Sequence, residues 1–294
     1  MELVFIVINY ENTLLTEECL ISLSRYADGE KKIVLLDNGS RDRSIEKLAC
    51  EFREVDFIFH STNSGFCKGN NIAIKHSISK YNPRYIFLVN NDAAVKSGDL
   101  RALLNFMDKN KKIGILGPKI ISYSTGKIWS AGGQVAIWRG FCRNRGINEE
   151  DRGQYENEAS VDFVSGCAML IRTELLEIIG YFDEKYFMYL EDVDICLRAK
   201  RNNYLIQYYP DFIIDHKISQ SAGSEYSYFS SFFRWRNRLL LVNKNAKKLN
   251  FYFFKFVIFP LIACRDMFRY IVYFQIKGIS SMIKGLLHGN KEVV

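Results

Sequence analysis

Residues 3–40 decide the fold class, and they read LVFIVINYENTLLTEECLISLSRYADGEKKIVLLDNGS. The apolar run over 3–8 predicts a buried strand, the apolar residues at helical spacing over 15–23 predict a helix, and the run over 33–36 predicts a second strand. This alternation continues to about residue 116. Continuous apolar strands separated by helices indicate an α/β fold, Rossmann-like, with a mainly parallel central sheet and helices on both faces.

Polar residues follow the predicted strands at the points where they end. Asn9 follows the first strand, Asp37-Asn38-Gly39-Ser40 follows the second, and Asn90-Asn91-Asp92 follows the apolar run at 85–89. Open parallel sheets bind ligands beyond the carboxyl ends of their strands. We therefore expect these residues to gather in one ligand site at that edge of the sheet.

Two of these motifs suit a nucleotide, and each has a plain structural alternative. Asp37 can accept hydrogen bonds from a base N–H or a ribose hydroxyl, but Asp-Asn-Gly is also a common turn. The segment 63–71, NSGFCKGNN, combines glycines with amides and leads into a helix N-terminus, which favours anions. It matches neither a dinucleotide-binding motif nor a P-loop, and it can equally be a structural loop.

A divalent cation site is one interpretation of two further segments. Asn90-Asn91-Asp92 offers oxygen ligands if a diphosphate supplies the others, or else it caps a helix. His216 follows a strand-like run at 211–214 and can ligate a metal or contact phosphate, although a lone histidine is usually structural.

Three carboxylates in four positions, Glu191, Asp192 and Asp194, follow the largely aromatic run at 186–189. Burial beside apolar side chains raises a carboxyl pKa and suits a general base. Successive residues at the start of a helix point in different directions, so the three cannot all face one substrate. We expect one to be the base and another to cap a helix that begins near Val193, with capping alone as the alternative.

Composition and charge separate the chain into two parts. The 294 residues include seven scattered cysteines without a C-x-x-C pair, and the N-terminus lacks a basic leader, which together predict a cytoplasmic protein. Residues 228–294 hold 12 lysines and arginines against two acids, a net charge of +10, whereas residues 1–227 hold 28 against 31, a net charge of −3. We expect a catalytic domain over 1–227 and a basic helical region over 228–294.

The C-terminal region is expected to touch a membrane. Residues 251–264 form an aromatic and aliphatic run interrupted by Lys255 and Pro260, which is too short and too charged to span a bilayer. Aromatic residues among lysines and arginines suit a helix that lies on an anionic leaflet, and a buried core or oligomer helix is the alternative. Nucleic acid is not expected as a partner, because so apolar a segment needs another surface to cover it.

Taken in order, the motifs resemble the inverting glycosyltransferase family 2 with the GT-A fold, and most of all its bacterial rhamnosyltransferase-type branch. The resemblance covers about residues 3–240. Each pattern is weak alone, and the ordered set is specific. The patterns are VINY at 7–10, DNGS at 37–40, NSGFCKGNN at 63–71, VNND at 89–92, GCAMLIR at 166–172, GYFDE at 180–184 and EDVDICLR at 191–198.

The resemblance implies a role for each matched residue. Asp37 would contact the nucleoside of a nucleotide-sugar, and Asp192 would be the base that deprotonates the acceptor hydroxyl. Asp92 and His216 would hold Mg²⁺ or Mn²⁺ on the diphosphate, with one acid available because Asn-Asn-Asp stands where the family has Asp-x-Asp. The other residues expected around the nucleotide-sugar are Asn9, Tyr10, Asn38, Asn63, Gly65, Lys68, Asn91, Gly166 and Glu191.

The sequence therefore predicts an inverting, metal-dependent glycosyltransferase that associates peripherally with the inner face of the cell membrane. It would move a sugar, with rhamnose from dTDP-rhamnose as the first candidate, to a hydroxyl of a lipid-linked glycan in bacterial surface polysaccharide assembly.

Two other classes of protein fit the sequence less well. A sugar-phosphate nucleotidyltransferase needs a Gly-rich, Arg-containing loop after the first strand, where this chain has Asn9-Tyr-Glu-Asn-Thr13. A non-catalytic glycan-binding or nucleic-acid-binding module gives no reason to set Asp92 and Asp192 on one pocket.

Overall fold

The computed structural model describes residues 1–26, 30–217, 228–272 and 276–293. The chain forms two compact units. The N-terminal unit comprises Met1–Gln134, Asn144–Phe187 and Glu191–Ser221, and the C-terminal unit comprises Val135–Arg143, Met188–Leu190 and Ala222–Val294. The domain boundary expected at residue 227 lies outside the described residues.

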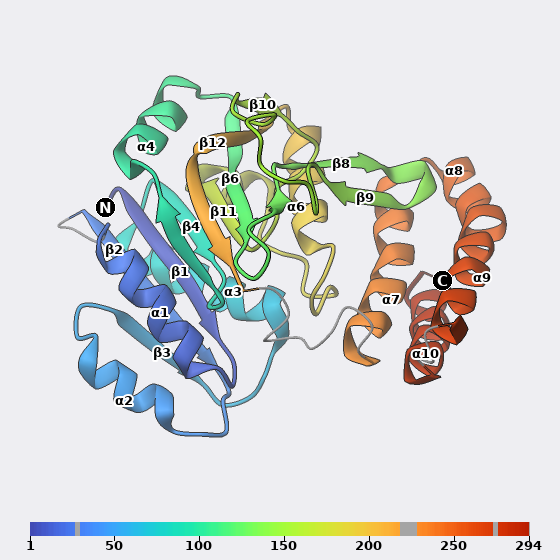
Figure 1. Cartoon of the computed structure of the whole chain (residues 1–294), viewed down its shortest axis with the longest axis horizontal. Helices are drawn as coiled ribbons and strands as arrows, with labels where there is room; N and C mark the ends of the chain where they lie inside the picture. The colour runs from blue at the N-terminus through green and yellow to red at the C-terminus, as the bar shows by residue number, and fades with distance from the viewer. Residues whose placement is uncertain (27–29, 218–227, 273–275, 294) are drawn as a thin grey trace. The chain divides into compact units, whose positions relative to one another are not determined.

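A mixed sheet forms the centre of the N-terminal unit (Figure 1). Its strands are β1 (Leu3–Asn9), β2 (Lys31–Asn38), β3 (Asp56–His60), β4 (Tyr85–Val89), β5 (Ala93–Ser97), β6 (Ile113–Ser122), β7 (Ile128–Ser130), β10 (Ala159–Ser160), β11 (Ala168–Arg172) and β12 (Leu205–His216). The main path runs β10-β12-β6-β11-β4-β1-β2-β3, with β5 paired to β12 and β7 to β6. On this path β11 and β10 run against the other strands, which share one direction.

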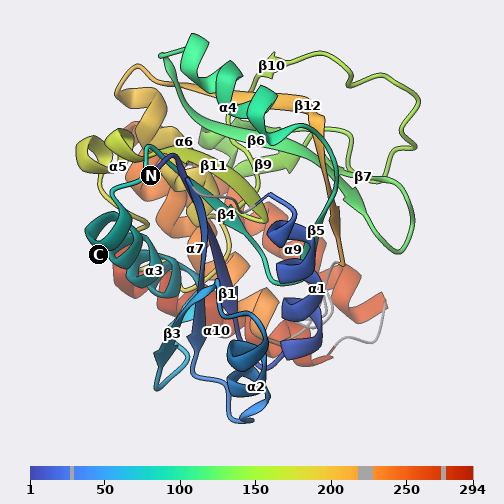
Figure 2. The same ribbon diagram turned by 90° about the vertical axis from the view of Figure 1, so that its left-hand side faces the viewer.

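Helices cover both faces of this sheet, as Figure 2 shows. One face carries α1 (Thr13–Ser24), α2 (Ser44–Glu51) and α4 (Leu100–Lys109), and the other carries α3 (Gly65–Tyr81), α5 (Thr173–Ile179) and α6 (Glu191–Arg201). The predicted α/β fold with a mostly parallel sheet between helices is therefore confirmed, with β11 as an antiparallel insertion between β4 and β6.

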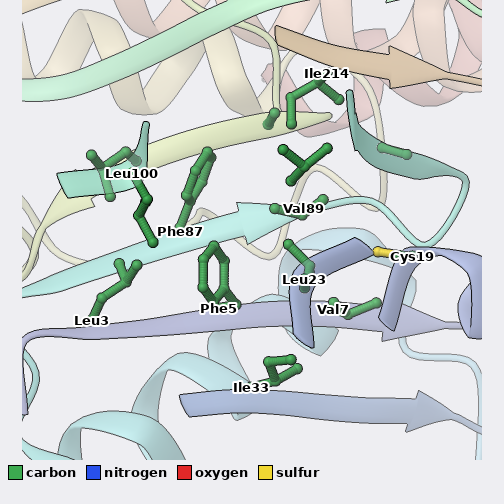
Figure 3. Packing of buried hydrophobic residues seen from close by; sticks show 14 of the residues in the cluster. Leu3, Phe5, Val7, Cys19, Leu23, Ile33, Phe87, Val89, Leu100 and Ile214 are labelled. Carbon is green, nitrogen blue, oxygen red and sulfur yellow. The ribbon is translucent and has the colours of Figure 1, made fainter. Parts of the chain in front are cut away.

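The core lies between the sheet and α1, α2 and α4. Alternate residues of β1 point to this side because side chains alternate along a strand, and the rings of Phe5 and Phe87 stack at 5.6 Å between centroids. Figure 3 shows both rings, with Leu23 of α1 next to Phe5 and Cys19 of α1 farther along the same layer. Burying an aromatic or aliphatic side chain contributes about 1.5–3 kcal/mol relative to leaving it exposed, so this layer fixes the strand ends that carry the site.

The segment at 118–160, which follows the predicted alternation of strands and helices, contains several strands. β6 continues to Ser122 because residues 118–122 pair in parallel with β12. After it come β7, the two-stranded sheet of β8 (Gly133–Ala136) and β9 (Phe141–Asn144), and the short strand β10. A single-sequence pattern misses this because the pairing partner lies about 90 residues away.

The C-terminal unit is helical. It contains η1 (Ile137–Arg139), α7 (Tyr228–Asn245), α8 (Lys248–Phe253), the π-helical η2 (Phe254–Ile258), α9 (Phe259–Val272) and α10 (Ile276–Val293). Its core includes Trp235, Phe254 and Phe259. The centroid of the Phe259 ring lies 5.2 Å from that of Trp235 and 5.2 Å from that of Phe254.

The aromatic run at 251–264 divides between this core and the surface. Phe251, Phe254 and Phe259 are buried, whereas Phe256 and Leu261 are each 67% exposed. Among the described helices, none combines the length and apolar character that crossing a membrane requires.

Candidate active site

Hydrogen bonds join the ends of β1 and β2 at one edge of the sheet. The parallel register places Asn9 opposite Asp37, and both side chains are buried. The Asn9 amide donates to Oδ1 of Asp37 across 2.7 Å, and the Ser40 hydroxyl and backbone N–H donate to the two carboxylate oxygens across 2.6 and 3.1 Å. Asp37 is therefore a fixed acceptor at a strand end, as its position in the sequence predicted.

The same network reaches the end of β4. The Thr16 hydroxyl, in the first turns of α1, donates to Oδ1 of Asn9 across 2.7 Å, and the Asn91 amide donates to that hydroxyl oxygen across 3.1 Å. Side chains that follow three different strands are thus linked, and the structure brings Asn9, Asp37 and Asn91 together. Tyr10 follows Asn9 in the chain and is half-buried.

The loop at 63–65 is organised by amide side chains. Asn38 donates to Oδ1 of Asn63 and to the Gly65 carbonyl, at 3.3 and 3.1 Å, while Asn63 accepts from the Gly65 N–H at 2.9 Å. Gly65 has φ of +82°, and a Cβ there would lie 2.6 Å from the Phe187 ring, so glycine is required. Lys68 is exposed on α3 and has no partner among the described residues, so no contact ties it to this group.

Asp92 and His216 lie side by side through the pairing of β5 with β12. His216 pairs with Ala93, which places its Nε2 atom 3.2 Å from Oδ1 of Asp92, with both side chains less than 10% exposed. Burial lowers the pKa of His216, but Cys167 and Asp92 outweigh it and raise the pKa to about 10. A buried carboxylate and imidazole are thereby held in one place.

This pair fits part of a divalent cation site. An oxygen and a nitrogen atom lie together, which suits Mn²⁺ or Mg²⁺ when the ion displaces the proton of His216 and further oxygens come from elsewhere. In the part of the chain that the structure describes, no group of three or more His, Cys, Asp or Glu side chains is placed to hold a metal. The described residues therefore provide two neighbouring ligands and leave the remaining positions to a ligand such as a diphosphate.

Asp192 is held by backbone N–H groups at the start of α6. Gly166 donates to Oδ2 across 3.1 Å, and Val193 donates to Oδ1 across 2.8 Å. Burial raises the pKa of the Asp192 carboxyl, and these two hydrogen bonds oppose the rise without cancelling it. The residue as a whole is partly exposed, and its carboxylate is oriented and more basic than that of an ordinary aspartate.

The other two carboxylates of this stretch have different surroundings. Glu191 is buried, and its Oε2 atom has no hydrogen-bond partner among the described residues. Burial and the charge of Asp192 raise its pKa well above the usual range. Asp194 is 1% exposed and pairs with Arg198 at 2.9 Å. The helix begins at Glu191 instead of near Val193, and of the three only Asp192 combines a fixed orientation with partial exposure of the residue.

The segments that carry Asp92 and Asp192 are linked through the turn Gly166-Cys167, which precedes β11. The Asn90 N–H donates to the Cys167 carbonyl across 2.8 Å, and Cys167 directly follows Gly166, the residue that holds Asp192. Asp92 stands two residues after Asn90. The carboxyl end of β4 and the start of β11 therefore bring both acids to the same edge of the sheet.

Sequence reasoning missed the roles of Asn71 and Arg198. Arg198 donates to the carbonyls of Ile179, Gly180 and Tyr181 as well as to Asp194. Asn71 donates to the Phe182 carbonyl across 2.9 Å and accepts from the Phe182 N–H across 3.0 Å. Together they fix the loop at 180–184 that leads toward α6. The spacing of Asp194 and Arg198, four residues apart on a helix, was a usable signal.

Two residues before α6 have an unusual backbone. Tyr189 and Leu190 have φ of 70° and 69°, a left-handed conformation that costs a non-glycine residue about 1–3 kcal/mol. Within the C-terminal unit, the buried Asn237 amide donates to the carbonyls of Met188 and Tyr189 across 2.8 and 2.9 Å. No sequence pattern indicated this turn.

Comparison with known proteins decides the family. The profile of the family described as Glycosyl transferase family 2 matches residues 4–179, more than half of the chain. The chain belongs to glycosyl transferase family 2. It is accordingly a glycosyltransferase with the GT-A fold, and the resemblance drawn from its motifs is confirmed. This membership disfavours the nucleotidyltransferase and the non-catalytic module.

Distant relatives of this family 2 glycosyltransferase include enzymes of glycan assembly. The low-salt glycan biosynthesis hexosyltransferase Agl10 of Haloferax volcanii is 26% identical over 295 residues, which cover 98% of this chain and 91% of the relative. The N-acetylglucosaminyl-diphospho-decaprenol L-rhamnosyltransferase of Mycobacterium tuberculosis is 26% identical over 231 residues, which cover 71% of this chain and 74% of the relative.

A solved structure shows the same fold at low sequence identity. The structure of GalNAc-T7 with UDP, GalNAc and Mn²⁺ aligns with a TM-score of 0.62 and 14% identity, covering 80% of this chain and 47% of that one. This chain thus spans about half the length of that solved protein, and the likeness concerns the fold alone.

Proposed function

We propose that this glycosyltransferase moves a hexose, with rhamnose as the first candidate, from a nucleoside diphosphate sugar to a hydroxyl of a lipid-linked glycan. The names of the relatives support a role in glycan assembly: one is a glycan biosynthesis hexosyltransferase and another a rhamnosyltransferase acting on a diphospho-decaprenol lipid. The transfer takes place in a single displacement that inverts the anomeric carbon.

The nucleoside occupies the edge of the sheet at β1 and β2. Asp37 keeps lone pairs for a base N–H or a ribose hydroxyl, since a carboxylate has about four acceptor positions and the described residues fill three. Asn9 and Asn91 orient this group through the Thr16 hydroxyl. Tyr10, Asn38, Asn63 and Gly65 shape the surrounding loop, and Lys68 is free to approach a phosphate from α3.

Asp92 and His216 hold the divalent cation, Mn²⁺ or Mg²⁺, against the diphosphate. Their side chains are already side by side and buried, so little conformational freedom is lost on binding. When bound, the metal offsets the negative charge of the leaving nucleoside diphosphate.

Asp192 is the general base, and this assignment rests on one observation. Of the three acids at the start of α6, Asp192 alone is fixed by two backbone N–H groups while the residue stays partly exposed, and its pKa is raised. It takes the proton of the acceptor hydroxyl as that oxygen forms the new bond to the anomeric carbon. The bond between this carbon and the diphosphate breaks on the opposite side, and the nucleoside diphosphate leaves with the electron pair.

The remaining part of the proposal concerns attachment to the membrane that holds the lipid-linked acceptor. The C-terminal unit exposes several large apolar side chains, among them Leu249, Phe256, Leu261 and Phe268, in a region of net charge +10. Exposed apolar residues among basic ones favour attachment to an anionic leaflet. We place the enzyme peripherally on the inner face of the cell membrane.

Isothermal titration of nucleotide-sugars, with and without Mn²⁺, tests this function. A panel of UDP-, GDP- and dTDP-sugars is titrated into the full chain, and released nucleoside diphosphate is then measured with a lipid extract as acceptor. Metal-dependent binding of one donor, followed by its turnover, is the expected result. Absence of binding by every donor contradicts the proposal.

A further inference from the structure

A cavity of about 180 Å³ lies within the C-terminal unit, between α7 and α9. Its volume is well above the roughly 10–15 Å³ that one water molecule needs. Four of its lining residues are arginines and one is an acid. The lining residues are Ser231, Arg234, Trp235, Arg238, Arg265, Asp266, Arg269 and Tyr270.

Asp266, the one acid among the described residues of the lining, pairs with Arg265 at 2.8 Å. Arg238 and Arg269 line the same space. Burial lowers the pKa of the Arg238 guanidinium, and the charges of Arg265 and Arg234 lower it further despite Asp266. Arginine stays charged in proteins nevertheless, so these like charges repel one another until an anion enters.

Two of the arginines have donors to spare. Arg238 lies over the ring of Trp235 at 5.4 Å, and neither Arg238 nor Arg269 makes a hydrogen bond or ion pair among the described residues. Each guanidinium offers five N–H donors in a planar fork, which matches the paired oxygens of a phosphate. At the wall, the hydroxyls of Ser231 and Tyr270 are hydrogen-bonded to each other at 2.8 Å, which adds polar groups to the lining.

The surface of the same unit indicates which kind of phosphate-containing molecule fits the cavity. Helix α9 supplies Arg265, Asp266, Arg269 and Tyr270 to the cavity, all within one half of the helix at 100° per residue. The rest of its circumference carries exposed apolar residues, among them Leu261 and Phe268, each 67% exposed. A ligand with a phosphate head and a long apolar chain satisfies both faces, whereas a free nucleotide or a nucleic acid leaves the apolar face in water.

We propose that this arginine cavity binds the diphosphate of a polyprenyl-type lipid, so that the C-terminal unit captures the acceptor by its head group. Arg238 and Arg269 contact the phosphate oxygens, and the apolar face of α9 contacts the chain at the membrane surface. That the lipid is the acceptor rests on the function proposed above, while the binding of a lipid diphosphate stands on the cavity alone.

Vesicle co-sedimentation of the full chain tests this inference. Phosphatidylcholine vesicles with a small fraction of undecaprenyl diphosphate are compared with vesicles that carry the same surface charge as phosphatidylserine. Arg238→Gln with Arg269→Gln removes two charges from the cavity, and Lys247→Gln with Lys248→Gln removes two charges from exposed positions at α8. Thermal melting verifies that both double variants fold, and Arg238→Lys keeps the charge but loses the planar fork.

The wild-type chain is expected to bind the diphosphate vesicles at least about tenfold more tightly than the phosphatidylserine vesicles, and the arginine double variant is expected to lose that difference. The lysine double variant keeps it, and Arg238→Lys falls between. Inorganic pyrophosphate competes weakly, because it lacks the chain.

Three results overturn the inference: equal binding to both kinds of vesicle, equal losses in the two double variants, or binding of pyrophosphate as tight as that of the lipid. Nucleotide-sugar titration on the same samples keeps the two proposals apart. If donor binding persists while the lipid result fails, only the lipid site is wrong; if donor binding is absent in the wild-type chain, the proposed function is wrong whatever the vesicles show.

Discussion

The backbone N–H of Gly166 donates a hydrogen bond to Oδ2 of Asp192 across 3.1 Å. This contact ties the start of α6 to the turn that precedes β11, and the next residue, Cys167, accepts a hydrogen bond from the Asn90 N–H through its carbonyl. Asp192 and the segment that carries Asp92 are therefore positioned by one short stretch of backbone, Gly166-Cys167, at the edge of the sheet. This rigid support suits a site that must stay aligned.

Turnover is expected to fall at acidic pH, with a midpoint above the ordinary aspartate pKa. Burial raises the pKa of Asp192, and a base acts only when deprotonated, so kcat is full above the raised pKa and falls as the pH drops through it. Burial and the charge of Asp192 raise the pKa of Glu191 well above its usual range, so Glu191 is still protonated while Asp192 ionises, and Glu191→Gln should leave the acidic limb in place. Measuring kcat against pH at saturating donor compares the two proteins, and an acidic limb that moves to lower pH in Glu191→Gln would show that Glu191 carries a charge in that range.

Asp37→Asn is expected to weaken nucleotide binding at least about tenfold, because a carboxylate that accepts from Asn9 and Ser40 is replaced by an amide that also donates. Asp42→Asn is the matched control, since Asp42 lies in the loop just after the motif but is exposed; the affinity of this variant should change by less than about twofold. Calorimetric titration with a nucleoside diphosphate measures both. Similar losses in the two variants argue against a specific role for Asp37.

Removal of the metal, or of its acidic ligand, is expected to have the same effect on donor binding. Chelation by EDTA should weaken binding at least about tenfold, and Asp92→Asn should abolish the enhancement by Mn²⁺. Asp215→Asn serves as control, because Asp215 precedes His216 but pairs with Lys96 at the surface. Donor titrations over a Mn²⁺ series provide the measurement. An Asp92→Asn protein with the wild-type response to Mn²⁺ means that the metal, if any, binds elsewhere.

Arg198→Ala is expected to destabilise the fold by about 3 kcal/mol, because it leaves Asp194 charged and buried and frees the carbonyls at 179–181. Arg152→Ala breaks an ion pair of two exposed side chains with Glu150 and should cost less than about 1 kcal/mol. Urea unfolding monitored by circular dichroism gives both values. Equal stability of the two variants shows that the loop at 180–184 does not depend on Arg198.

The sequence predicted those parts of the site that depend on local pattern. Asp37 and Asn91 follow apolar strands directly, and parallel strands bring their carboxyl ends to one edge, so their meeting could be expected. The neighbourhood of Asp92 and His216 could not be derived in this way. It depends on the pairing of β5 with the end of β12, which lie more than 100 residues apart and leave no trace in local periodicity.

Other features could not be predicted from the sequence, for different physical reasons. α3 begins at Gly65, within the segment 63–71 that was expected to lead into it, because the Phe66 N–H donates to the Phe187 carbonyl, a distant partner that replaces a local cap. The positive φ angles at Tyr189 and Leu190 contradict local preference and persist through tertiary contacts. The arginine cavity is formed by residues of α7 and α9, two helices that α8 and η2 separate in the sequence.

Single-turnover sugar transfer by Asp192→Asn, with donor affinity measured on the same protein, tests the assignment of the base most directly. Asparagine keeps the shape of the side chain but cannot take the acceptor proton, so the transfer rate should fall by about 10²–10⁴ while the affinity for the nucleotide-sugar changes by less than about threefold. A rate close to that of the wild-type protein would show that another group removes the proton and that Asp192 is not the base.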